Sequence, residues 1–273
     1  MCTNKNRKSA SLDHITTLVI ALLLLACGVK CTNSDSHIQA LLEPLALTNK
    51  ASIDYTTAVA RFQHPDRQTL QLIKVEIKSI GDLERKQNYL EAANRTLSLR
   101  KAFEIAGTNL APLLPDFGSE FLSGDSVGAS GWALVTIGGD AWLTLLQGLT
   151  NTNLRVQLCA VEAMPYANGT NAALALPFLE SFLTNKSDIL RIQSVDAIGQ
   201  LAVDVKGKTN SLLHTMEVDT NITVRCMAIK ALGRLGNSEN VIAILQQASK
   251  DKNASVRYAA TTMLKEIFDR KNQ

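Results

Sequence analysis

The chain has 273 residues, of which 46% are hydrophobic and 5% aromatic, and its formal net charge is +3. This composition is that of a folded protein and suits helices rich in Leu and Ala that pack on one another. From position 100 onward, 16 basic and 16 acidic residues balance, so the sequence lacks the basic stripe of a duplex-binding protein, and we expect no nucleic-acid partner.

The first 26 residues, 1–26, have the composition of an export signal peptide. Three basic residues lie within 5–8, and the uncharged apolar run 15–26 is too short to span a bilayer core as a helix. The run closes with LLAC at 24–27, which resembles a bacterial lipoprotein signal. The resemblance implies a lipid on Cys27 and an exported protein anchored to a membrane of the cell envelope. Signal cleavage nearby, giving a secreted or periplasmic protein, and an uncleaved single-pass anchor are the alternatives.

Two segments separate this signal from the rest of the chain. Residues 27–37 are small and polar, as expected of a tether. Residues 38–99 are expected to form a helical N-terminal cap, because apolar residues recur at helical spacing over 70–80. The pair Gly81-Asp82 is expected to end that helix, and a further helix is expected over 83–106.

A short block recurs through residues 100–268. Its copies are VQLCAVEAM at 156–164, LRIQSVDAIG at 190–199, VRCMAIKALG at 224–233 and VRYAATTML at 256–264. The second residues of these blocks are Gln157, Arg191, Arg225 and Arg257, so the steps between them are 34, 34 and 32. A weaker copy places an earlier register residue at Val127. A fixed period of this size indicates a stacked array of helix pairs, with 269–273 as a polar tail.

Each repeat unit is expected to contain two helices, with the recurring block as the second. The first helices are expected at 108–122, 140–149, 171–183, 208–217 and 238–249. A residue suited to capping a helix stands four positions before the register residue in the last four units, namely Asn153, Ser187, Asn221 and Asn253. Small and apolar residues form one face of each second helix, and Gly199 and Gly233 are expected to end theirs with a left-handed backbone.

These blocks resemble those of HEAT-repeat proteins, of the short type also found in phycobilisome-lyase-like repeat proteins. The helix around WLTLL at 142–146 and the segment GTNLAPLLP at 107–115 add to the resemblance, whereas Gln157 and Val127 replace the expected arginine. The resemblance implies an all-α, right-handed α-solenoid of about five helical hairpins that starts at residue 100.

The arginines at the register positions are expected to have a structural role. They are Arg191, Arg225 and Arg257. In HEAT repeats such an arginine bonds across the turn between the paired helices or to the adjacent repeat, and its planar guanidinium suits several acceptors at once. The alternative is a row of cations that grips an anionic ligand.

A partner surface is expected on the second helices, which tend to line the concave side of HEAT arrays. The outward positions that we single out are Glu162, Gln193, Asp196, Met227, Lys230 and Tyr258. Their mixed charges, with Met and Tyr interleaved, suit an unknown protein or peptide better than a polyanion. The alternative is a face that only contacts water.

No catalytic motif stands out. HExxH, GxSxG, P-loop and GxGxxG patterns do not occur, and no cofactor is expected. Cys159 and Cys226 are expected to fill the core, and without a CxxC pair we expect no metal site. The sequence therefore predicts a non-catalytic protein-binding scaffold of the cell envelope. A lyase-like or chromophore-attachment enzyme on the same solenoid is the first alternative, and a nucleic-acid-binding HEAT-like protein is the second.

Overall fold

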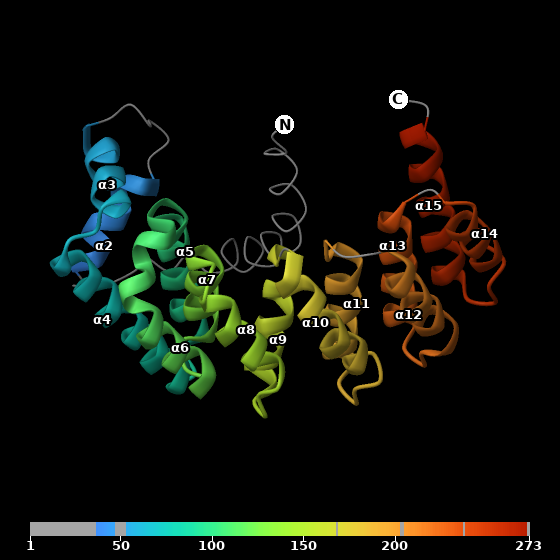
Figure 1. Cartoon of the computed structure of the whole chain (residues 1–273), viewed down its shortest axis with the longest axis horizontal. Coiled ribbons are helices and arrows are strands. Elements are labelled where there is room, and N and C mark those ends of the chain that lie inside the picture. Colours follow the sequence, from blue (N-terminus) through green and yellow to red (C-terminus); the bar gives the residue numbers. More distant parts are fainter. Residues whose placement is uncertain (1–36, 47–52, 168, 203–204, 237, 272–273) are drawn as a thin grey trace.

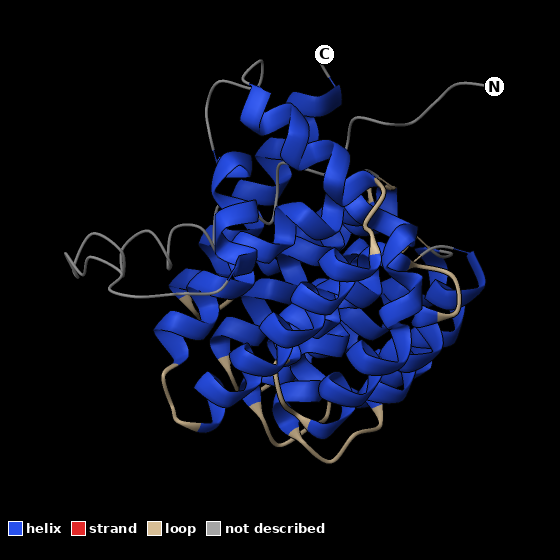
Figure 2. Cartoon of the chain, turned by 90° about the vertical axis from the view of Figure 1, so that its left-hand side faces the viewer, coloured by secondary structure: helices blue, strands red, loops and turns tan. Residues whose placement is uncertain are grey.

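The structure, a computed structural model, describes residues 37–46, 53–167, 169–202, 205–236 and 238–271. This part of the chain is helical and contains no strand (Figure 2). The helices follow one another in chain order along an arc, and the turns between paired helices lie at its outer edge (Figure 1). The predicted all-α solenoid is confirmed. The signal segment, Cys27 and the tether up to residue 36 lie outside the described residues.

Five helical hairpins form the array within these residues. The first helices are α6 (Leu114–Ser123, preceded by the 3-10 helix η2, Gly107–Leu113), α8 (Ala141–Leu149), α10 (Gly169–Phe182), α12 (Val205–Val218) and α14 (Glu239–Ala248). The second helices are α7 (Val127–Ile137), α9 (Leu154–Ala163), α11 (Asp188–Gln200), α13 (Ile222–Leu235) and α15 (Ala254–Lys271). The repeat period therefore located every hairpin.

The N-terminal cap consists of α2 (His37–Leu42), the 3-10 helix η1 (Glu43–Ala46), α3 (Ile53–Gln63), α4 (Arg67–Arg85) and α5 (Tyr89–Ala106). The prediction that Gly81 ends its helix was wrong, because α4 continues to Arg85. Gly81 is buried, and a Cβ atom there would lie 3.3 Å from Cβ of Asp125 in the turn before α7. The glycine allows this turn to approach the helix closely. At the end of the cap, α5 packs against α7 as one second helix packs against the next.

The second helices bury one face along their whole row. In α13 the residues Ala228, Ile229, Ala231 and Leu232 are each 0% exposed, as the repeat pattern predicts. In the last described helix Thr261 is exposed, since no described unit packs over it. Consecutive second helices pack on one another at every step from α5 to α15, more extensively than consecutive first helices do. They form one continuous layer, and we call its solvent-facing side the second-helix face.

The capping residues occupy their predicted places. Side-chain oxygens of Asn153, Ser187, Asn221 and Asn253 accept hydrogen bonds from backbone N–H groups in the first turns of their helices. These bonds satisfy donors that a helix N-terminus leaves free. The last helix is longer than predicted and includes 269–271, and Arg270 Nη2 donates to the carbonyl of Gly233 at 3.0 Å.

The two glycines that were expected to end second helices do not do so. Gly199 and Gly233 lie inside α11 and α13, and neither has a positive φ. A Cβ atom at Gly199 would lie 2.7 Å from Cβ of Ala231, and one at Gly233 would lie 2.9 Å from Sδ of Met263. Their role is to let consecutive second helices approach each other closely, and a side chain at either position would force neighbouring atoms to move.

Candidate functional site

The register arginines bind the turns between the paired helices. Arg191 makes a bidentate contact with the Asp219 carboxylate of the next unit, with Nε–Oδ2 and Nη2–Oδ1 distances of 2.8 and 3.1 Å. Its Nη1 donates to the carbonyl of Asn185 in its own turn at 2.8 Å, and Asp188 lies 2.7 Å away. Hydrogen bonding to Asp219 raises the pKa of Arg191. The Arg191 guanidinium group therefore bonds residues of two consecutive units at once.

The same pattern weakens toward the C-terminal end. Arg225 reaches the carboxylate of Asp251 only at 3.7 Å and the carbonyl of Asp219 at 3.5 Å. Arg257 donates to two carbonyls of its own turn, those of Asp251 and Lys252, at 2.8 and 2.9 Å. Arg257 has no carboxylate partner because no described unit comes after α15 to supply one. Arg191 therefore has the geometry of a structural link.

The aspartates that Arg191 and Arg225 contact also shape the turns. Asp219 Oδ1 accepts from the backbone N–H of Asn221, and Asp251 Oδ1 accepts from that of Asn253, at 2.8 and 2.7 Å. Asn185 forms the corresponding bond with Ser187 at 2.9 Å. A carboxylate or amide two residues before the cap thus closes each turn and places its acceptors in front of the register residue. The sequence analysis did not single out these residues, although they recur at a fixed offset.

The six predicted partner residues all lie on second helices but differ in accessibility. Glu162, Lys230 and Tyr258 are exposed, whereas Gln193, Asp196 and Met227 are half-buried. Asp196 is engaged within the protein, since its carboxylate bonds Arg234 of the next second helix and Gln200 of its own. The exposed three lie in two separate grooves of the second-helix face.

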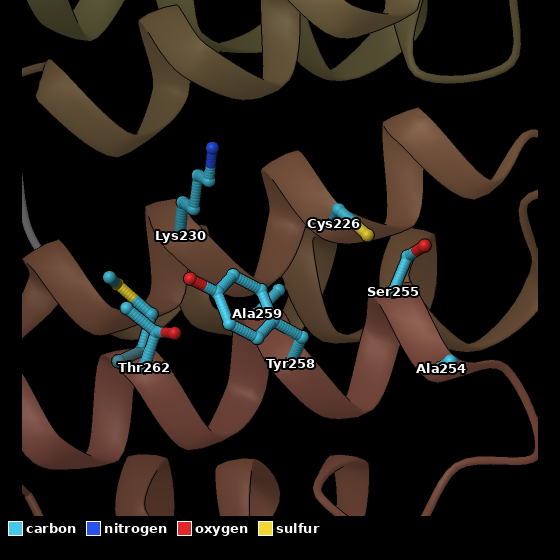
Figure 3. Close-up of a pocket in the computed structure, with 8 residues that line it drawn as sticks. Cys226, Lys230, Ala254, Ser255, Tyr258, Ala259 and Thr262 are labelled. Carbon is cyan, nitrogen blue, oxygen red and sulfur yellow. The ribbon is translucent and has the colours of Figure 1, made fainter.

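The first groove lies between α13 and α15 and has a volume of about 420 Å³. Lys230 is its one charged lining residue, and no described residue forms an ion pair with it. Tyr258 is 74% exposed, and in Figure 3 its ring lies between Cys226 and Ser255 at one end and Lys230 and Thr262 at the other. Such an exposed aromatic side chain beside a cation is typical of residues that contact another protein.

The second groove, of about 490 Å³, lies between α5, α7 and α9. Its lining includes Glu162 and two aromatic residues that the sequence analysis did not single out, Tyr89 and Trp132. Arg100 lies over the Trp132 ring at 4.0 Å, and Arg155 lies over the Tyr89 ring at 5.8 Å. The indole N–H of Trp132 is buried without a hydrogen-bond partner in the described structure. Because Tyr89 lies on α5, which belongs to the cap, no repeat signal could point to it.

The two cysteines of the grooves do not have the lowered pKa of an activated thiol. Burial raises the pKa of Cys159 to about 12, and its thiol lies 3.4 Å from the carbonyl of Val127. Burial also raises the pKa of Cys226. Both thiols are therefore protonated near neutral pH and react slowly as nucleophiles. Among the described residues, no cluster of His, Cys, Asp and Glu has the geometry to hold a metal ion.

None of the helices between residues 37 and 271 combines the length and the hydropathy that crossing a membrane requires.

Comparison with known proteins identifies the repeats at the C-terminal end. Residues 209–272 match the family model of HEAT repeats. No curated protein sequence matches the chain. Among solved structures, Cex1p is similar at 14% identity, with a TM-score of 0.45 over 85% of this chain and 52% of that chain, so the chain spans about half the length of Cex1p.

Two further structures show a similar distant likeness. Human deoxyhypusine hydroxylase, solved in complex with glycerol, is 16% identical, with a TM-score of 0.40 over 93% of this chain and 99% of that chain. An engineered protein is 16% identical, with a TM-score of 0.48 over 92% of this chain and 71% of that chain.

Proposed function

We propose that this HEAT-repeat protein is a non-catalytic scaffold that binds another protein or a peptide on its second-helix face. The observation that carries the proposal is the exposed pair Lys230 and Tyr258 beside an open groove between two packed helices. The face is continuous because the second helices pack in one row. An extended surface of this kind is what repeat arrays offer to partners.

The electrostatics favour a protein over an anionic polymer. Arg191 is occupied by the carboxylates of Asp219 and Asp188 and by the carbonyl of Asn185, so it cannot also bind phosphates without breaking the turn. The outward positions carry both signs, with Glu162 and Lys230 at the same offset in their units. A nucleic acid would require an excess of cations on the bound face. A catalytic role would require a nucleophile or an acid–base pair, whereas the two described thiols have raised pKa values.

A photo-crosslinker in place of Tyr258 tests the proposed face. With p-benzoylphenylalanine at this position, illumination of cells that express the chain should yield a discrete crosslinked species, identified by mass spectrometry. Gln246, an exposed residue of the first helix α14, provides the matched control and should give no such species. Equal crosslinking from the two positions, or none from Tyr258, would argue against a specific partner surface there.

We also propose that Cys27 carries a lipid that holds the scaffold at a membrane of the cell envelope. The proposal depends on the LLAC sequence at 24–27 and on the basic and apolar segments before it. One acyl chain binds a membrane only marginally, whereas the three chains of a bacterial lipoprotein cysteine anchor it securely.

Metabolic labelling with palmitate tests the anchor. The wild-type chain should incorporate label and sediment with membranes, whereas Cys27→Ser should lose the label and shift to the soluble fraction. Cys31→Ser, in the same polar segment, is the matched control and should keep the label. An unlabelled wild-type chain would end this part of the proposal.

A further inference from the structure

The groove where the cap meets the array has the shape of a helix-binding site. Its walls are α5 and α9, and α7 forms its floor. On α5 the lining residues extend from Tyr89 to Arg100, which corresponds to ~17 Å along a helix axis at 1.5 Å per residue. A groove of this length can hold about three turns of a further helix.

The floor is low near the N-terminal end of α7, where Gly128 presents no side chain. Gly128 is exposed, and the nearest atom to a Cβ built there is Cγ2 of Thr96 on α5, at 3.8 Å. The walls beside it carry apolar side chains that water contacts, since Leu97 is 50% and Tyr89 is 55% exposed. When an apolar side chain of a ligand enters the groove, Leu97 and Tyr89 would lose contact with water, which favours binding.

The charges of the groove are paired with one exception. Arg155 Nη2 lies 2.8 Å from Glu84 Oε2, and Arg100 Nε lies 3.1 Å from Glu104 Oε1. For Glu162 of α9, no described residue provides an ion pair. When Glu104 is counted with the lining residues, the groove has three acidic and two basic side chains.

The environment of Glu162 disfavours its lone negative charge. Partial desolvation by the groove raises the pKa of this carboxyl group, although the side chain still contacts water. Cys159, one turn earlier on the same wall, stays protonated and offers no compensating charge. A cationic group brought in by a ligand would supply the missing counter-charge.

We propose that this groove binds an amphipathic helix of a partner protein, with its apolar residues over Gly128 and Leu97 and a lysine or arginine paired with Glu162. The inference rests on the proposed scaffold function and specifies one of its binding sites. Apolar anchors that lie in a groove, with a charge at its rim that sets orientation, are the usual means of helix recognition. The opposite charge of Lys230 in the other groove makes that groove the internal comparison.

Peptide binding to the purified full chain tests the inference. The probe is a fluorescein-labelled, end-capped peptide of twelve residues, made of Leu, Ala and Lys with the leucines on one helical face. Matched peptides carry Gln or Glu in place of every Lys. Fluorescence anisotropy should give the tightest binding for the Lys peptide, about tenfold tighter than for the Gln peptide, and the weakest for the Glu peptide.

Four variants assign the binding to the groove. Glu162→Gln should weaken binding of the Lys peptide about five- to tenfold and leave the Gln peptide unchanged. Gly128→Leu, which fills the floor, should abolish binding of both peptides, while Gly128→Ala should retain it. Lys186→Gln, at an exposed position in the turn between α10 and α11 and outside both grooves, should change neither affinity. Circular dichroism establishes that each variant keeps its helices, which is expected because position 128 is exposed.

Two results would overturn the inference. One is equal binding of the Lys and Glu peptides, and the other is unchanged affinity in both Glu162→Gln and Gly128→Leu. Neither result touches the scaffold function itself, which depends on crosslinking from Tyr258 in the groove between α13 and α15. Failure of that crosslinking alone, with the peptide results as expected, would restrict the binding surface to the groove at the cap.

Discussion

Replacing Gly199 by alanine should lower the free energy of unfolding by about 2 kcal/mol, although alanine is the better helix former. The new methyl group would lie 2.7 Å from Cβ and 3.0 Å from Cα of Ala231. The second of these atoms belongs to the backbone of α13, so the contact cannot be relieved by rotating a side chain. Relief requires α11 and α13 to separate, which weakens their shared buried face.

Gly207 provides the matched control for this substitution. It lies in α12, it is exposed, and a Cβ atom there would meet no atom within 4 Å. Gly207→Ala should therefore stabilise the protein by up to about 1 kcal/mol through helix propensity alone. Urea denaturation followed by circular dichroism measures both variants. A Gly199→Ala protein as stable as Gly207→Ala would show that the two second helices are not packed as closely as the structure indicates.

Local and periodic features of this fold could be predicted from the sequence. The period near 34 residues located the hairpins, and the capping positions identified the start of the last four second helices, as at Asn221. Both signals depend on residues close together in the chain. The roles of Gly81 and Gly199 could not be obtained in this way. The sequence alone does not distinguish a glycine that ends a helix from one that lets a neighbouring helix approach.

The candidate site was predicted only in part, for a related reason. Lys230 and Tyr258 lie on repeat helices, so their offsets indicated that they face outward, and both are exposed. Tyr89 and Leu97 lie on α5. The sequence of this helix does not resemble the repeat block, but the helix packs against α7 as a second helix does. A search for large apolar residues left outside the core face of 83–106 would have found both. The pairing of α5 with α9 across α7 depends on three-dimensional stacking.

Removing the Arg191 side chain should cost more stability than removing the equivalent side chain at the end of the array. The Arg191 and Asp219 side chains are 10% and 6% exposed, so Arg191→Ala leaves a buried carboxylate without its partner. We expect a loss of about 2 kcal/mol in the free energy of unfolding. Arg257 is exposed and bonds only turn carbonyls, so Arg257→Ala should cost at most about 1 kcal/mol.

A double-mutant cycle separates the charge pair from the turn. Asp219→Asn keeps a side-chain oxygen for the N–H of Asn221 but removes the negative charge. If Arg191 and Asp219 act together, the double variant should be more stable than the sum of the two single losses implies, by about 1 kcal/mol or more. Strictly additive losses in urea denaturation would mean that Arg191 stabilises only its own turn, through Asn185, and does not link consecutive units. Coupling would instead show that the Arg191–Asp219 pair links the stability of α11 to that of α13. A stacked array requires such coupling between units to keep its partner surface in one shape.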